Sequence, residues 1–156
     1  MGNIHPRIMV SFLNEDDEQS LWVRNTLVEN LKGKYGLDKV MIVEGLDNFM
    51  DDIVPFLSGE PKQDFLICVC TPQYAKNASE LHIEAFLPNL INAPVTAFSR
   101  FRKIAAVIRK GSFRDAKPEF LMHSEGILMT DEESDKNMER LFGLIKKGSE
   151  QSEIKS

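Results

Sequence analysis

The chain has 156 residues, of which 42% are hydrophobic, 28% charged and 8% aromatic. This length suits one domain that buries a core without a structural metal or disulfide. The composition excludes a disordered, collagen-like or coiled-coil chain. A formal net charge of −5 is unlike that of a duplex DNA-binding protein, which needs a basic surface.

Targeting and membrane signals are missing from the sequence. The apolar runs are far shorter than the roughly 20 residues that cross a bilayer, and the first residues do not form a secretory signal. We therefore expect a soluble, cytoplasmic protein that binds neither membrane nor nucleic acid. We expect one domain over residues 7–147, with flexible termini at 1–6 and 148–156.

The two cysteines, Cys68 and Cys70, stand two positions apart in an apolar run. On one strand their side chains would lie about 6.5 Å apart along the chain, so a disulfide between them would be strained. Two thiols without a nearby histidine also fall short of a zinc ligand set. The pattern predicts buried, reduced thiols and no metal site.

Hydrophobic patterning predicts strands that alternate with helices. The first strand is expected at residues 8–12, and the acidic segment 14–18 follows it. These acids favour the positive end of a helix dipole, so they mark the start of the first helix. The apolar stripe of that helix is expected to comprise Leu21, Trp22, Leu27, Val28 and Leu31.

The rest of the chain repeats this alternation. Further strands are predicted at residues 40–43, 65–70, 104–108 and 127–129, and further helices at 49–57, 80–87 and 134–147. The strands are apolar throughout, which is typical of parallel strands covered on both faces. The pattern predicts an α/β fold, a doubly wound five-stranded parallel sheet with helices on both faces. Ligands of such sheets bind beyond the carboxyl ends of the strands.

Several common sites of α/β proteins are excluded by the residues that follow the strands. The loop after the first strand has no Gly-x-Gly-x-x-Gly pattern, and the chain contains neither a Walker loop nor a Gly-x-Ser-x-Gly elbow. A phosphate-accepting receiver domain would need an aspartate where Cys70 and Thr71 stand. The three histidines are scattered in sequence, which argues against a catalytic triad or a metal site.

Two carboxylates remain as candidates, Glu80 and Glu84, four positions apart in the predicted helix at 80–87. Asn77 can cap that helix, which would give Glu80 a structural role in a capping box. Glu84 lies one turn deeper among apolar neighbours. A carboxylate in a partly apolar cleft can stabilise the oxocarbenium-like state of glycoside-bond cleavage. Judged by spacing alone, a glutamate at this position is more often a solvated helix acid.

A basic stretch lies between Glu84 and Asp115, where the sequence contains no acid. It either forms a solvated connection or faces an anion or a partner. Its six bases are Arg100, Arg102, Lys103, Arg109, Lys110 and Arg114.

The order of several short segments is similar to that of a known family. They are the opening strand Ile8-Met9-Val10-Ser11-Phe12 with its acidic loop, Trp22-Val23, Phe49-Met50, the block Leu66-Ile67-Cys68-Val69-Cys70-Thr71-Pro72-Gln73-Tyr74-Ala75-Lys76, and the strand and loop at 103–111. Over residues 7–147 the chain resembles the Toll/interleukin-1 receptor (TIR) domains of the bacterial type.

This resemblance implies a flavodoxin-like sheet and cleavage of the nicotinamide–ribose bond of NAD, with hydrolysis or cyclisation of the ADP-ribose that remains. NAD would be the substrate, and no cofactor is implied. The glutamate of the family corresponds to Glu84, which would bind the ribose hydroxyls and stabilise the transition state. By position, the residues expected to line the pocket are Ser11, Phe12, Asn14, Gly45, Asp47, Thr71 and Tyr74.

Two functions follow from the resemblance. The first is an NAD nucleosidase in bacterial signalling or defence, activated by self-assembly through TIR–TIR contacts or by another signalling protein or fused domain. The second is a non-catalytic interaction module that uses the stretch 100–114 and the loop at Gly45. The connection at residues 44–48 is short for the family, which keeps the second function open.

Overall fold

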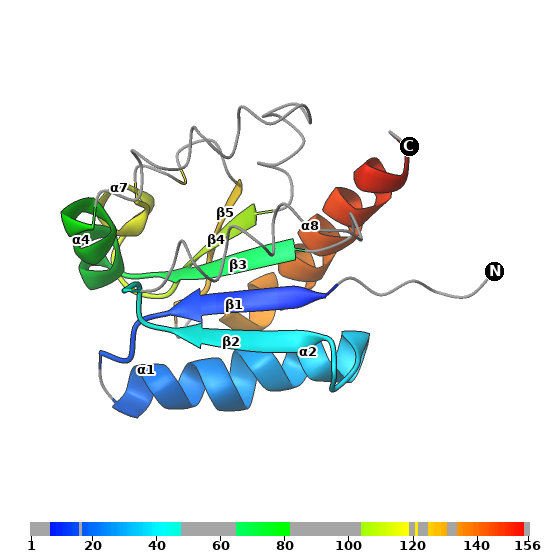
Figure 1. Cartoon of the computed structure of the whole chain (residues 1–156), viewed down its shortest axis with the longest axis horizontal. Helices are drawn as coiled ribbons and strands as arrows, with labels where there is room; N and C mark the ends of the chain where they lie inside the picture. Colours follow the sequence, from blue (N-terminus) through cyan, green and yellow to red (C-terminus); the bar gives the residue numbers. More distant parts are fainter. Residues whose placement is uncertain are drawn as a thin grey trace.

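The computed structural model describes residues 7–15, 17–47, 65–81, 104–118, 121, 125–130 and 134–154. Its strands are β1 (Ile8–Phe12), β2 (Val40–Glu44), β3 (Phe65–Cys70), β4 (Ile104–Ile108) and β5 (Glu125–Leu128). These strands form one parallel sheet in the order β2-β1-β3-β4-β5 (Figure 1). This is the flavodoxin-like, doubly wound arrangement, so the predicted fold class is confirmed.

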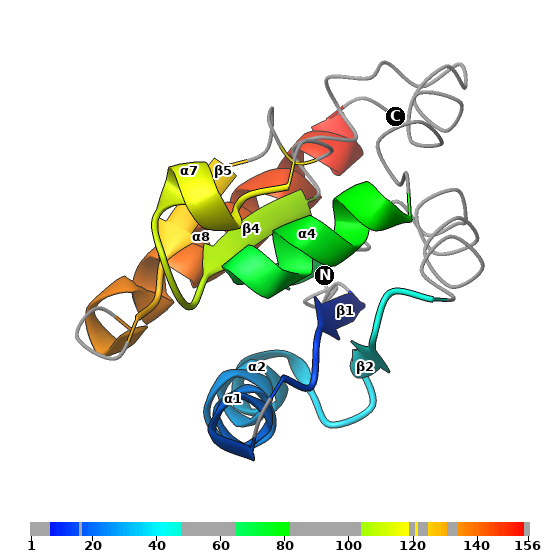
Figure 2. The same ribbon diagram turned by 90° about the vertical axis from the view of Figure 1, so that its left-hand side faces the viewer.

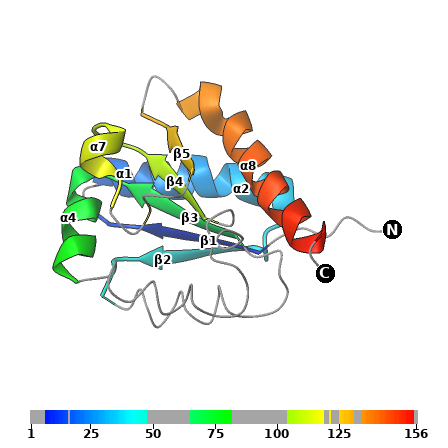
Figure 3. The ribbon, with the colours of Figure 1, turned by 90° about the horizontal axis from the view of Figure 1, so that it is seen from above.

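Helices cover both faces of the sheet (Figures 2 and 3). On one face lie the continuous helical segment α1 (Asp17–Trp22), η1 (Val23–Leu27) and α2 (Val28–Tyr35), and helix α8 (Ser134–Ile154). On the other face lie α4 (Pro72–Glu80) and the short helix α7 (Phe113–Ala116). None of the described helices is both long and apolar enough to cross a membrane.

Successive residues of the strands point to opposite faces, so an uninterrupted apolar strand contributes to two cores. Val10 and Ile67 pack under α1, α2 and α8, whereas Leu66 and Cys68 pack under α4. Cys68 and Cys70 are fully buried and free, as the sequence predicts. Burial raises the pKa of Cys68 to about 12 and raises the pKa of Cys70 well above its usual value, so both thiols stay protonated.

The first helix contains one wide turn that the sequence analysis did not predict. In η1, a π-helical turn, the N–H of Val28 bonds to the carbonyl of Val23, five residues back. The apolar residues on either side of this turn are five positions apart, so the wide turn keeps Val23 and Val28 on the core side. Val23 is fully buried, whereas Leu21 is 57% exposed. The prediction that Leu21 belongs to the buried stripe is therefore wrong.

The helix after β3 begins earlier than the sequence analysis places it. α4 spans Pro72–Glu80, with Thr71 as its N-cap and Pro72 at its first position, where a missing N–H is harmless. The predicted capping box is wrong because Asn77 lies inside this helix and Glu80 in its last turn. In addition, β5 begins two residues before its predicted start at residue 127, and α8 continues beyond its predicted end at residue 147. The helix predicted at 49–57 lies outside the described residues.

Candidate functional site

The candidate site lies at the carboxyl ends of β1 and β3, which are neighbours in the sheet. From β1 the chain crosses one face of the sheet through α1–α2 to reach β2, whereas β3 leads into α4 on the other face. Connections therefore diverge between these two strand ends, and in doubly wound sheets ligands bind at such a point. Residues 11–15, 44–47 and 71–74 surround it (Figure 2).

The carboxyl edge of the sheet around β1 and β3 is called the rim below. The side chains of Ser11 and Tyr74 meet beneath it. The hydroxyl oxygens of the two side chains are 2.8 Å apart, and both residues are fully buried. Desolvation raises the pKa of Tyr74 well above its usual value, so its phenol stays neutral. The contact satisfies two buried hydroxyl groups and fastens the first turn of α4 to β1.

Thr71 joins the loop after β1 to the start of α4. Its Oγ1 accepts the N–H of Tyr74 over 3.1 Å, which caps the helix. The same hydroxyl donates to Oε2 of Glu15 over 2.6 Å. Glu15 was not among the residues predicted to line the site, because the acidic segment 14–18 was interpreted as stabilising the positive end of the helix dipole. The signal available in the sequence was its position, three residues after the end of β1.

Phe12 and Gly45 are joined through their backbones at the ends of β1 and β2. The N–H of Gly45 donates to the carbonyl of Phe12 over 2.8 Å, and Gly45 has a φ of 84°, which favours glycine. The ring of Phe12 is fully buried under α1–α2, whereas Asn14 and Asp47 are exposed. The structure thus joins Ser11 to Tyr74 and Phe12 to Gly45.

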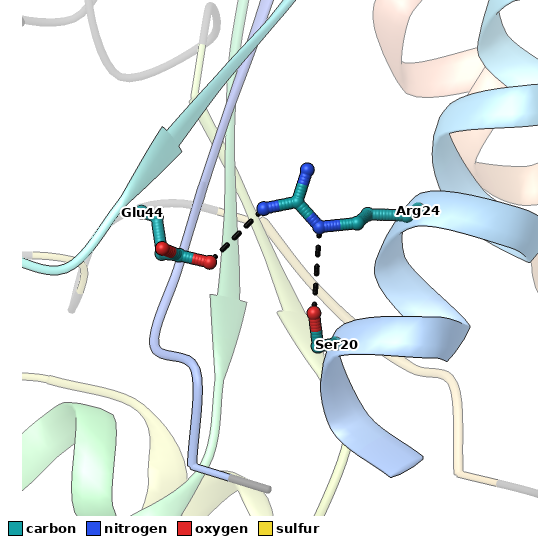
Figure 4. A network of polar contacts seen from close by, with 3 residues as sticks. All are labelled: Ser20, Arg24 and Glu44. Atoms are coloured by element: carbon teal, nitrogen blue, oxygen red, sulfur yellow. Dashed lines mark hydrogen bonds and ion pairs between the residues drawn. The ribbon is translucent and has the colours of Figure 1, made fainter. Parts of the chain in front are cut away.

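Arg24, in the π-helical turn, reaches the end of β2 (Figure 4). Its Nη2 donates to Oε1 of Glu44 over 3.0 Å, and its Nε to Oγ of Ser20 over 3.4 Å. Its guanidinium carbon lies 5.6 Å from the ring centroid of Phe12. The side chains of Arg24 and Glu44 are about half exposed, at 46% and 45%. Neither residue stands out in the sequence, because their partnership depends on the fold.

Arg109 belongs to the basic stretch, but its side chain points into the interior. It is 6% exposed, and its guanidinium carbon lies 4.4 Å from the ring centroid of Trp22. Its Nη1 also donates to the carbonyl of Met129 over 3.0 Å. Arg109 therefore links the end of β4 to the first helix and to the residue after β5. Lys110 and Arg114 are more exposed, whereas the segment 100–103 lies outside the described residues.

Glu84, the predicted catalytic carboxylate, also lies outside the described residues. Glu80 is exposed in the last turn of α4, one residue before the end of the described segment 65–81. Among the residues that the structure describes, no group of three or more histidine, cysteine or acidic side chains could hold a metal ion.

Comparison of the chain with family models, with curated proteins and with solved structures finds no match.

Proposed function

We propose that the chain is a TIR-type domain that cleaves the nicotinamide–ribose bond of NAD at the carboxyl edge of its sheet. The observation that supports the proposal is a contact between two of the segments that resemble the TIR family. One segment forms β1, and the other forms β3 and the start of α4. Ser11 from the first segment bonds Tyr74 from the second, at the point where ligands of doubly wound sheets bind. The order of the remaining segments supplies the choice of family and substrate.

The proposed reaction separates neutral nicotinamide from ribose. The bond between the ribose C1′ and the pyridinium nitrogen breaks, and nicotinamide leaves with the bonding electron pair. The carboxylate of Glu84 would stabilise the positive charge that develops on the ribose. Addition of water to C1′ with loss of a proton gives ADP-ribose, and attack by the adenine of the same molecule gives the cyclic product.

The pocket residues have different parts in this proposal. The pairs Ser11–Tyr74 and Thr71–Glu15 would hold the two strand ends at a fixed separation. Asn14 and Asp47 are exposed at the rim and would contact the nucleotide directly. NAD is the substrate, and the proposal requires no separate cofactor.

The experiment is incubation of concentrated protein with NAD, with nicotinamide and ADP-ribose separated by chromatography. Release of nicotinamide in proportion to protein supports the proposal. Absence of release at high concentration, also with a natural partner present, contradicts it and supports the second function.

The second function is a non-catalytic interaction module acting through TIR–TIR contacts. One observation favours it. Four of the expected pocket residues are fully buried, so their side chains support the rim from beneath instead of facing a ligand; they are Ser11, Phe12, Thr71 and Tyr74. The exposed part of the basic stretch, with the 42% exposed ring of Phe113 beside Arg114, would then form the contact surface. Measurement of self-association at rising concentration, in wild type and in Arg114→Glu, tests this alternative.

A further inference from the structure

Arg24 contacts three consecutive elements of the chain, which are β1, the helical segment α1–α2 and β2. Its guanidinium contacts Ser20 within its own helical segment and Glu44 at the end of β2 (Figure 4). The guanidinium also lies over the ring of Phe12 at the end of β1. A guanidinium keeps its charge at all working pH values and presents its donors in a rigid plane, which suits contact with three groups at once. Arg24 thus forms a cross-link between helix and sheet.

The place of Arg24 in the π-helical turn follows from the core beneath it. Val23 and Val28 are buried on either side of the wide turn, and their hydrogen bond fixes its geometry. Arg24 follows Val23 directly, so it leaves the helix at a position fixed by the core. π-helical turns occur frequently at functional sites, and this one contains the arginine that reaches the end of β2.

The end of β2 receives support from this arginine. In the sheet that the described strands form, β2 is an edge strand, paired with β1. Glu44 is its last residue, and Gly45 follows with a left-handed backbone and one hydrogen bond to Phe12. The turn 45–47 is therefore anchored by the bond from Gly45 to Phe12, by the buried Leu46 and by the pair Arg24–Glu44.

We infer that Arg24 is a positioning residue: through Glu44 it sets where Gly45 and Asp47 stand at the rim of the sheet. The inference rests on the proposed function in one respect, since it takes Gly45 and Asp47 to contact the substrate. A half-exposed ion pair of this kind changes a local equilibrium by about twofold to fivefold. Such a contact can open while the core stays folded, so it adjusts the turn without deciding whether the chain folds.

The experiment measures amide hydrogen exchange at Gly45 in folded protein. Arg24→Gln and Glu44→Gln each remove one charge, and we expect each to speed exchange at Gly45 about twofold to fivefold. The double variant should show no further increase, because both changes break the same contact. Arg24→Lys retains the charge but loses the rigid plane of donors, so its exchange rate should lie between those of wild type and Arg24→Gln. Arg140→Gln, an exposed arginine on α8, is the matched control and should leave Gly45 unchanged.

A second readout uses the proposed reaction. Arg24→Gln should raise the KM for NAD about twofold to fivefold and leave kcat within about twofold, because a displaced turn weakens binding. If wild type releases no nicotinamide, the proposed function fails and the exchange measurement alone decides the positioning role. Unchanged Gly45 exchange in Arg24→Gln and Glu44→Gln would overturn the inference. A fall in kcat with constant KM would overturn it as well.

Discussion

The hydroxyl oxygens of Ser11 and Tyr74 lie 2.8 Å apart in the interior, and their contact joins β1 to the first turn of α4. We expect Ser11→Ala and Tyr74→Phe each to lower the free energy of unfolding by about 1–3 kcal/mol, since each removes a hydrogen bond between buried hydroxyl groups. The double variant should lose less than the sum of the two. Urea denaturation of all four proteins gives the coupling energy, and strict additivity would contradict the contact.

Thr71 connects the helix start to the loop after β1 through one hydroxyl group. Thr71→Val should reduce the free energy of unfolding by about 1–2 kcal/mol, because it removes the cap of α4 and the donor to Glu15. Thr71→Ser keeps that hydroxyl and serves as the control, with a loss at most half as large. Equal losses in the two variants, measured by urea denaturation, would show that the hydroxyl is unimportant.

Arg109 and Trp22 form a buried stack at the ends of β4 and α1. Arg109→Lys keeps the charge but loses the planar surface and the fixed donors, so we expect a loss of about 1–2 kcal/mol in stability. The indole should also become more exposed, which tryptophan fluorescence would report as a shift to longer wavelength. An unchanged spectrum together with wild-type stability would refute the proposed role of the stack.

The buried thiols make stability depend on alkaline pH. Desolvation raises the pKa of Cys68 from its usual 9.0 to about 12. As the pH rises above about 9 the unfolded chain releases this proton while the folded protein retains it. The stabilisation is therefore complete below pH 9 and is lost progressively as the pH rises toward 12, with a slope of up to about 1.4 kcal/mol per pH unit.

Urea denaturation from pH 7 to pH 11 checks this dependence. Cys68→Ala removes one titrating thiol, so its stability should fall less steeply above pH 9 than that of wild type. Thiol-specific reagents at pH 8 should label the cysteines only after denaturation. Parallel slopes for the two proteins, or rapid labelling of the folded protein, would be inconsistent with the burial of Cys68.

The sequence predicted the sheet better than the helices because the strands carry the stronger local signal. Runs such as residues 65–70 are apolar without interruption, and their predicted bounds agree with β3. Leu21 was wrongly expected to be buried because a regular 3.6-residue period cannot represent the π-helical turn, which places Val23 in the core instead. The helix after β3 was predicted to start too late, because the apolar positions of α4 are few and its start depends on the cap by Thr71.

The pocket residues Ser11, Thr71 and Tyr74 were expected from the family resemblance, and the fold joins Ser11 to Tyr74. That these residues line a ligand pocket stays a prediction. Contacts between residues of different elements, such as that of Arg24 with Glu44, carry no local sequence signal, because they depend on how the helix packs against the sheet. The role of Glu84 stays a prediction.

The most direct test of the proposed function compares two glutamates of the same segment. Nicotinamide release from NAD is measured for wild type, Glu84→Gln and Glu80→Gln at matched high protein concentration, with folding checked by circular dichroism. Our account predicts that Glu84→Gln lowers the rate about 100-fold or more, because the developing charge loses its carboxylate, while Glu80→Gln stays within about twofold. Equal rates in Glu84→Gln and wild type would contradict the account, as would a folded wild type that releases no nicotinamide.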